Sequence, residues 1–203
     1  MILSFRLVLA ITAGCLAVPV ALRAVDDEGS AGKPLAKSTA DLIQKQAPPI
    51  IAAELAAKVT PENSRIIINL ATQRARLLGG DAVYIDTPIS SGKLAARTPA
   101  GTFAILEKIN EHRSGMYGHF VDKRGQIVRA GVSMRLDAAP AGTHYVDAPM
   151  RFFCRFGNGG IGVHSGILPG YPAAHGSIRL PEEVAKLVFG KVKVGTPVEI
   201  RTE

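Results

Sequence analysis

The sequence predicts one mainly β domain with one or two short helices, preceded by a leader and a tether, on the basis of three observations. From Arg65 onward, short runs rich in β-branched residues are separated by breaks that contain glycine. Within that region only 181–190 has the composition and the ends of a helix. The 203 residues are 47% hydrophobic and include 21 Gly and 13 Pro, which excludes a repeat array, a collagen-like rod and a wholly disordered chain.

The first 24 residues have the features of a secretory signal peptide. Arg6 precedes the apolar stretch 7–20, and Ala24 offers a small residue before an acidic segment. The stretch is shorter than the about 20 residues of a membrane span, although a retained N-terminal anchor stays an alternative. The segment 12–15, Thr-Ala-Gly-Cys, approximates a lipoprotein cleavage box in which a lipidated Cys15 would tether the protein to a membrane. We therefore expect an exported protein of the periplasm or cell envelope.

Residues 25–60 are predicted to form a tether followed by a short helix. The segment 25–40 is acidic and then rich in Gly, Ser and Lys, with no periodic apolar pattern. Pro48 and Pro49 precede 50–58, a run of good helix formers with proline where a helix can begin. We expect this helix to pack on the domain that follows, residues 61–203.

The domain itself reads as a series of short strands with one helix. The predicted strands are 65–70, 74–78, 82–85, 102–106, 126–132, 151–156, 161–164 and 198–201. The helix over 181–190 has Pro181 at its start, two acidic residues in its first turn and Gly190 at its end. There are no internal repeats and no second binding module.

Charge and cysteine usage limit the partners. The formal net charge is +7, but the cations are scattered without interleaved aromatic residues, so we expect no nucleic-acid partner. A mildly basic surface suits a polyanionic envelope. The two cysteines are Cys15, in the leader, and Cys154, so we expect no disulfide inside the folded domain.

Chemistry-bearing residues concentrate in 162–181. His164 ends a predicted strand, a loop rich in Gly and Pro follows, and His175, Gly176 and Ser177 lead towards the helix. Such a layout can bring an imidazole beside a nucleophile while backbone amides point at a developing oxyanion.

Several segments of the chain resemble the L,D-transpeptidase family, whose domain is called YkuD-type. Segment 65–74 resembles the family's first strand with its Gln-Arg step. Segments 89–93 (Ile-Ser-Ser-Gly-Lys) and 98–103 (Thr-Pro-Ala-Gly-Thr-Phe) resemble its serine-glycine and Thr-Pro-x-Gly-x-Phe segments, and 148–153 resembles the strand before its catalytic loop. Segment 168–181 resembles the family signature, normally Ala-Ser-His-Gly-Cys-[Ile/Val]-Arg-Leu. The resemblance covers residues 61–201 and implies a β-sandwich.

The resemblance implies an enzyme that attacks the peptide stem of peptidoglycan after a meso-diaminopimelate, forms a thioester and passes the acyl group to an amine. By position, His164 would donate and accept the proton, and Ser177 occupies the place of the nucleophilic cysteine. The residues implied for the oxyanion hole and its loop are Gly176, His175 and Ser165, and those implied for substrate binding are Arg179, Tyr171, His112 and Tyr117. We expect no cofactor, and the spacing of His112, His119 and His144 predicts no zinc site.

The serine at position 177 leaves several interpretations open. A hydroxyl needs a base during attack, whereas a thiol is already partly thiolate. A serine triad normally includes a buried carboxylate, and Asp137 or Asp147 could orient His164 in that way. Ala174 also replaces a serine common in the family. The chain is a native serine variant with acyl transfer or slow hydrolysis, a pseudoenzyme that binds stem peptides, or the product of a laboratory Cys→Ser change.

Cys154 is an alternative nucleophile, because its strand and that of His164 flank the hairpin at 157–160. With a two-residue Asn-Gly turn Phe153 would face His164, whereas one bulge residue would bring Cys154 there instead. A function of another class, an envelope scaffold with a vestigial cleft, also remains open.

Overall fold

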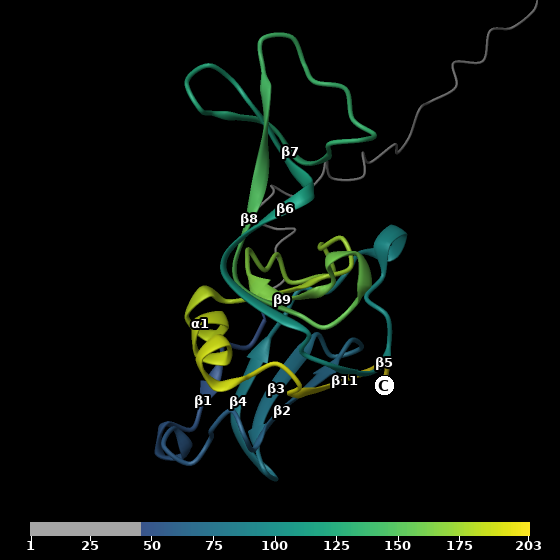
Figure 1. Cartoon of the computed structure of the whole chain (residues 1–203). Coiled ribbons are helices and arrows are strands. Elements are labelled where there is room, and N and C mark those ends of the chain that lie inside the picture. The colour runs from purple at the N-terminus through teal and green to yellow at the C-terminus, as the bar shows by residue number, and fades with distance from the viewer. Residues whose placement is uncertain (1–45) are drawn as a thin grey trace, which may run out of the picture. The chain divides into compact units, whose positions relative to one another are not determined.

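The computed structural model of the chain describes residues 46–203 (Figure 1). Within this part, eleven strands and one α-helix are arranged around two sheets, which confirms the prediction of a mainly β domain. The predicted signal peptide (1–24), the lipidation at Cys15 and the tether at 25–40 lie outside the described residues. Over 46–203, no helix has both the length and the apolar character needed to cross a membrane.

The first sheet has six strands in the order β1-β4-β3-β2-β11-β5. Its strands are β1 (Ile50–Ile51), β2 (Ser64–Asn69), β3 (Arg74–Gly79), β4 (Ala82–Pro88), β5 (Gly101–Ala104) and β11 (Pro197–Arg201). The last strand, β11, runs parallel to β2 and antiparallel to β5. Because β11 lies between these two strands, the sheet joins the beginning and the end of the domain.

The second sheet has five strands in the order β10-β9-β8-β6-β7. Its strands are β6 (Glu107–Val121), β7 (Ile127–Ser133), β8 (His144–Arg155), β9 (Gly162–Ser165) and β10 (Ile178–Leu180). Only β9 and β10 pair in parallel; the other neighbours are antiparallel. The outer parts of β6 and β8, together with β7, project away from the first sheet (Figure 1). We call this projection, residues 116–146, the arm.

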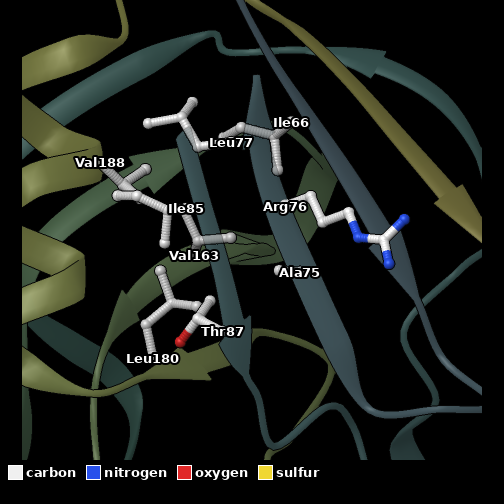
Figure 2. A pocket seen from close by; sticks show the side chains of 9 residues that line it. All are labelled: Ile66, Ala75, Arg76, Leu77, Ile85, Thr87, Val163, Leu180 and Val188. Atoms are coloured by element: carbon white, nitrogen blue, oxygen red, sulfur yellow. The ribbon is translucent and has the colours of Figure 1, made fainter. Parts of the chain in front are cut away.

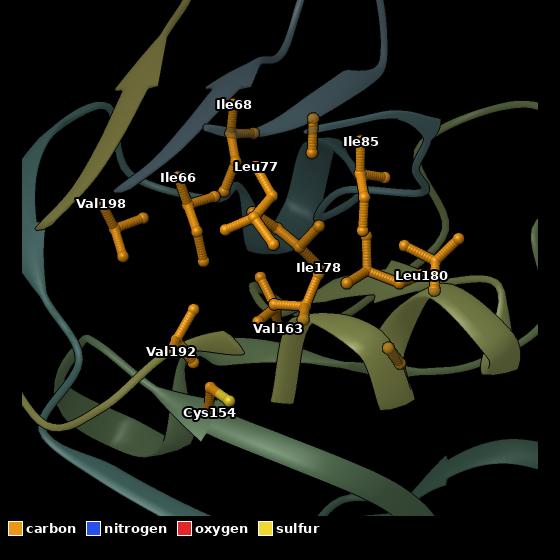
Figure 3. Packing of buried hydrophobic residues seen from close by; sticks show 14 of the residues in the cluster. Ile66, Ile68, Leu77, Ile85, Cys154, Val163, Ile178, Leu180, Val192 and Val198 are labelled. Atoms are coloured by element: carbon orange, nitrogen blue, oxygen red, sulfur yellow. The ribbon is translucent and has the colours of Figure 1, made fainter. Parts of the chain in front are cut away.

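The hydrophobic core lies between the first sheet and strands β8 to β10. Figure 3 shows Ile68 and Leu77 of the first sheet facing Val163 of β9 and Ile178 of β10, and all four side chains are nearly or fully inaccessible to solvent. Helix α1 (Glu182–Lys191) adds buried side chains at Val184, Ala185 and Val188. Each fully buried Leu, Ile or Val side chain stabilises the fold by roughly 1.5–3 kcal/mol, because it is removed from water. This cluster therefore holds the two sheets together.

One small void, of about 10 Å³, lies inside this core between the first sheet, β9 and α1 (Figure 2). Its lining is apolar apart from Thr87 and Arg76, and the Arg76 guanidinium points away from the void to bind Asp86 at 2.7 Å. The void is no larger than a single water site, so it is a packing defect and not a ligand site.

The helix predicted over 50–58 is wrong in extent. Ile50 and Ile51 form β1 and pair with Asp86 and Ile85 of β4, and only one 3-10 turn, Ala53–Leu55, remains helical. A helix of only nine residues is marginally stable in water. Pairing with the edge of β4 instead provides hydrogen-bond partners for the backbone of Ile50 and Ile51.

Most predicted strands are present with shifted ends, but three strands were missed: β1, described above, β6 and β10. Strand β6 covers a segment in which the sequence predicted no strand, and β8 begins seven residues before the predicted start at 151. Strand β10 lies within the predicted loop and pairs with both β9 and Ser90. The helix predicted over 181–190 is confirmed as α1, and its first turn contains both glutamates.

Candidate active site

An open cavity of about 920 Å³ lies on the face of the second sheet that is turned away from the core. Strands β6 and β8 bound it on one side, and β9 with the loop 166–177 bounds it on the other. Of the residues that the sequence singled out, those that line it are His112, Tyr117, His164, Ser165, Tyr171, His175, Ser177 and Arg179. Gly176 is not among the lining residues, but it directly precedes Ser177.

The two-residue period of β9 and β10 places the key side chains on this face. Val163 and Ile178 point into the core, so the neighbouring His164 and Arg179 project from the opposite face of the sheet. In the parallel pairing of the two strands, Arg179 lies directly opposite His164. Ser177 comes two residues before Arg179 and shares that face. His164, before the loop, and Ser177 and Arg179, at and after its end, therefore face the same cavity.

His164 is buried and held in one tautomer. Its Nδ1 lies 2.7 Å from the Ser165 carbonyl oxygen, which can only accept, so we assign the ring proton to Nδ1. Burial lowers the pKa of His164 to about 4, against the opposing effect of the Ser165 carbonyl and with a further lowering by the charges of Arg179 and His112. At neutral pH the ring is therefore uncharged, and Nε2 is free to take a proton.

The Ser177 hydroxyl is buried at the floor of the cavity and donates to the Gly160 carbonyl oxygen at 3.2 Å. Within 46–203, no hydrogen bond joins this hydroxyl to the His164 ring. Gly160 belongs to a short 3-10 turn between β8 and β9. Proton transfer to Nε2 of His164 therefore requires the hydroxyl to rotate away from Gly160.

Two backbone amides beside this hydroxyl are unpartnered. The N–H groups of Gly176 and Ser177 donate to no acceptor in the described part of the chain. Gly176 has φ = 103°, a left-handed conformation that side chains disfavour and that glycine adopts freely. Adjacent free N–H groups of this kind can stabilise a developing oxyanion.

Buried hydroxyl groups hold the loop 166–177 against the first part of the domain. The fully buried Ser90 donates to the Tyr171 carbonyl at 2.8 Å and accepts from the Ala173 N–H at 3.1 Å. Thr98 donates to the Gly176 carbonyl at 2.8 Å. Sequence reasoning quoted both segments for their resemblance but gave these hydroxyl groups no role. The sequence contained one signal for this role, which is that small polar residues occur within glycine-rich segments.

The Gln73 side chain binds Ser91, the neighbour of Ser90. Its Oε1 accepts from the Ser91 N–H at 3.0 Å, and its Nε2 donates to the Ser91 hydroxyl at 2.8 Å and to the Leu70 carbonyl at 2.7 Å. The Gln73 carbonyl also accepts from the Ile89 N–H at 3.0 Å, so both the side chain and the backbone of Gln73 bind the segment 89–91.

Two aromatic stacking contacts involve residues that line the cavity. The rings of Tyr117 and His175 stack with centroids 3.9 Å apart, and His112 stacks on Phe153 at 4.3 Å. Burial lowers the pKa of His175, and the charges of Lys93 and Arg179 lower it further. The Tyr117 contact links β6 to the loop, so it joins the two walls of the cavity.

Arg179 gives the cavity a positive character. Its guanidinium donates to the Ile167 carbonyl at 3.4 Å, and burial lowers its pKa. None of the described residues that line the cavity is an aspartate or glutamate. An uncompensated cation in a concave, partly buried site attracts anionic ligands.

The alternative chemistry at Cys154 does not fit the geometry. Cys154 pairs with Val163 in the ladder and lies in the core (Figure 3), whereas Phe153 lies on the side of His164, with ring centroids 6.4 Å apart. Burial raises the pKa of the Cys154 thiol to about 12, and the charge of Lys108 opposes this. The thiol is therefore a small buried hydrophobe.

Neither carboxylate considered as a partner of His164 bonds to its ring in the described part of the chain. Asp137 accepts from Arg129 at 2.6 Å and from the Ser133 N–H at 2.7 Å, in the arm. Asp147 lies opposite Gly118 in the β6–β8 ladder, and Nδ1 of His164 is already bound to Ser165. Over 46–203, no group of three or more His, Cys, Asp or Glu side chains is arranged to hold a metal ion.

Comparison with known proteins gives one family. Residues 63–200 match the YkuD family model, described as the L,D-transpeptidase catalytic domain. An L,D-transpeptidase from Mycobacterium smegmatis aligns with a TM-score of 0.52 and 20% identity, over 68% of this chain and 58% of that chain. L,D-transpeptidase 3 from Mycobacterium tuberculosis, solved with a faropenem-derived adduct, gives a TM-score of 0.50 and 18% identity, over 68% and 60%.

These structural similarities show a shared fold. The chain spans less than two thirds of the length of these two solved structures. No curated protein matches this chain.

Proposed function

This chain belongs to the YkuD family of L,D-transpeptidase catalytic domains, and on that premise we propose that it acts on peptidoglycan stem peptides by acyl transfer or slow hydrolysis, with Ser177 as the nucleophile. One observation carries the proposal. His164 of β9 and Ser177, which directly precedes β10, both line one cavity. The Ser165 carbonyl also fixes the His164 tautomer that a general base needs.

In the proposed reaction, Oγ of Ser177 attacks the carbonyl carbon of meso-diaminopimelate, in the peptide bond that follows this residue in the stem, and Nε2 of His164 takes the hydroxyl proton. The oxyanion accepts hydrogen bonds from the N–H groups of Gly176 and Ser177. As the tetrahedral intermediate collapses, the C–N bond breaks and the leaving amine takes the proton from His164. An acceptor amine or water then attacks the carbonyl carbon of the resulting ester and loses a proton to Nε2 of His164. As this second tetrahedral intermediate collapses, the bond from the acyl carbon to Oγ of Ser177 breaks, and His164 returns the proton to Oγ.

The remaining lining residues have proposed binding roles. Arg179 would hold a stem carboxylate, since no lining acid competes for it among the described residues. Tyr171, Tyr117 and His112 would contact the peptide, and His175 would order the loop through its stacking on Tyr117.

A second candidate, a pseudoenzyme that binds stem peptides without turnover, is favoured by the state of the same two residues. The Ser177 hydroxyl donates to Gly160 and not to His164. The lowered pKa of His164, about 4, makes its neutral ring a weak base for a hydroxyl proton. Binding needs neither property.

Mass spectrometry separates the two candidates. We expect the protein to form an ester adduct on Ser177 when incubated with a disaccharide tetrapeptide or a carbapenem, and Ser177→Ala to form none. His164→Ala should slow adduct formation by about 10²–10⁴-fold. Adducts of equal yield in the parent and in Ser177→Ala would contradict the nucleophile assignment.

If the parent forms no adduct, Ser177→Cys and a thermal-shift measurement complete the test. Adduct formation only in Ser177→Cys, with a stem peptide that raises the melting temperature of the parent, supports the pseudoenzyme. No adduct in either protein and no thermal shift would favour the envelope scaffold.

We further propose that the protein is exported to the periplasm or cell envelope, from the apolar stretch 7–20 and the small residue Ala24. Lipidation at Cys15, which would tether it to a membrane, is the alternative to cleavage after Ala24. N-terminal sequencing and intact mass of the protein recovered from envelope fractions distinguish them. A start at Val25 supports cleavage, a diacylated Cys15 supports the tether, and an intact Met1 in soluble cell extract would contradict export.

A further inference from the structure

The peptide group between Gly176 and Ser177 is held by a hydroxyl from a distant part of the chain. Thr98 is 6% exposed, and its Oγ1 accepts from the Gly92 N–H at 2.9 Å and donates to the Gly176 carbonyl at 2.8 Å. A threonine hydroxyl has one proton. Because the Gly92 amide already supplies a proton to this oxygen, the hydroxyl proton is directed to Gly176.

This anchor fixes the direction of the Ser177 N–H. The C=O of Gly176 and the N–H of Ser177 belong to one peptide group, and no peptide bond in the described chain is cis. In a trans peptide these two bonds point in opposite directions. With the carbonyl held by Thr98, the N–H points away from Thr98, and it has no acceptor within 46–203.

The anchor is rigid because the two segments touch at backbone level. A Cβ atom on Gly92 would lie 2.9 Å from the Gly176 nitrogen and 2.8 Å from the Thr98 nitrogen. Both neighbours are main-chain atoms, which cannot move aside as a flexible side chain can. Only a glycine at position 92 lets the loop approach this closely.

We propose that Thr98 is a positioning residue for the oxyanion site, which turns the Gly176–Ser177 peptide so that the Ser177 N–H faces the substrate carbonyl in the cavity. The chemical role of this N–H rests on the proposed function, whereas its orientation by Thr98 does not. Thr98 touches neither the substrate nor the reacting atoms.

The orientation is tested first, without any substrate. We would measure the residual dipolar coupling and the exchange rate of the Ser177 amide in the full chain, for the parent, Thr98→Val, Thr98→Ser and Thr87→Val. We expect Thr98→Val to change both the coupling and the exchange rate. Thr98→Ser keeps a hydroxyl at position 98 and should therefore give the values of the parent. Thr87 is a matched control, because it is also buried and, among residues 46–203, its hydroxyl bonds only to the neighbouring Pro88 carbonyl. A Ser177 coupling in Thr98→Val equal to that of the parent overturns the proposal.

The chemical consequence is tested with a carbapenem as the probe, in the parent and in Ser177→Cys. We expect Thr98→Val to lower the first-order acylation constant at least about tenfold, by analogy with the loss of an oxyanion donor, while the dissociation constant of the non-covalent complex stays the same. Thr98→Ser should recover the rate. A weakened non-covalent complex with an unchanged acylation constant would contradict a positioning role.

The two tests separate failure of this proposal from failure of the proposed function. If neither the parent nor Ser177→Cys is acylated, acyl chemistry at position 177 fails, and the dipolar coupling still decides the role of Thr98. If acylation occurs and Thr98→Val leaves both its rate and the coupling unchanged, the positioning role alone fails.

Discussion

Burial, more than any neighbouring charge, sets the state of His164. His164 is 7% exposed, and loss of water disfavours the charged form of its ring. The Ser165 carbonyl stabilises a proton on Nδ1, but it does not offset burial, and the pKa falls to about 4. A neutral ring with a free Nε2 suits a general base in geometry, while its low basicity suits a slow reaction.

This pKa predicts a pH-dependent stability. Because the unfolded chain has His164 near its ordinary pKa of 6.5, it binds more protons than the folded chain between about pH 6.5 and 4. Stability is therefore complete above that window and falls as the pH is lowered through it, by about 2 kcal/mol between pH 7 and pH 5. Urea unfolding at the two pH values measures this.

His164→Gln is the control for this experiment, since it removes the titrating group and keeps a polar side chain. The variant should lose less stability between pH 7 and pH 5 than the parent. Some dependence will remain, because burial also lowers the pKa of His175. Equal losses in both proteins would show that His164 is not the group responsible.

Gly92 gives a second prediction at this scale. Gly92→Ala should destabilise the domain by about 1–3 kcal/mol or more, because its Cβ would press on main-chain atoms of Thr98 and Gly176. Gly190→Ala is the matched control, since position 190 is helical and open, and alanine there should stabilise by up to about 1 kcal/mol. Equal unfolding midpoints for the two variants would argue against the close approach.

Among the elements, β6 and β10 show how pairing overrides local sequence. Strand β6 contains glutamate, lysine, histidine and two glycines, residues with low strand preference. It is a strand because β8 and β7 pair with it on both sides. Strand β10 has only three residues, and its backbone is held by β9 and by Ser90. Neither element has a local signal that would identify it without its partners.

The interior position of β11 predicts a strong effect of truncation. Ending the chain after Gly195 would remove the strand between β2 and β5 and expose the partners of Val198 and Ile200, both buried. We expect loss of the cooperative unfolding transition, measured by circular dichroism. Removing only Thr202 and Glu203, which are exposed, should leave the transition in place. A cooperative transition in the longer truncation would contradict the central role of β11.

For the whole described domain, stability is distributed unevenly. The core between the two sheets contains most of the buried hydrophobic side chains, whereas β7 in the arm is exposed from Ile127 to Gly131 and has one paired edge. Local opening costs least where few apolar contacts and exposed backbone hydrogen bonds hold a segment.

Hydrogen exchange should therefore be faster in the arm than in the core of the domain. We expect amides of Ile127–Gly131 to exchange at least about tenfold faster than those of Ile66–Ile68, since the latter lie in a strand that is paired on both sides. Mass spectrometry of peptic fragments after a short deuterium pulse measures the difference. Equal protection of the two segments would mean that the arm is stabilised by contacts beyond those of β6.

The sequence by itself determined the mainly β class, helix α1 and the segment that contains His164 and Ser177. These follow from patterns within about ten residues: β-branched runs, proline and acids before a helix, and a motif around two histidines. Even so, local preference overestimated the helix at 50–58, where β4 offered a sheet edge.

Tertiary structure alone decided which side chains meet. Whether Phe153 or Cys154 lies beside His164 depends on strand register, and a shift of one residue reverses it. His164 bonds to the Ser165 carbonyl and not to Asp137 or Asp147, and Thr98 bonds to the Gly176 carbonyl. Both contacts depend on where the folded backbone places its carbonyl groups. The sequence identifies which groups can react, because that depends on residue type. The distances between those groups are set only when long-range strand pairing fixes the register.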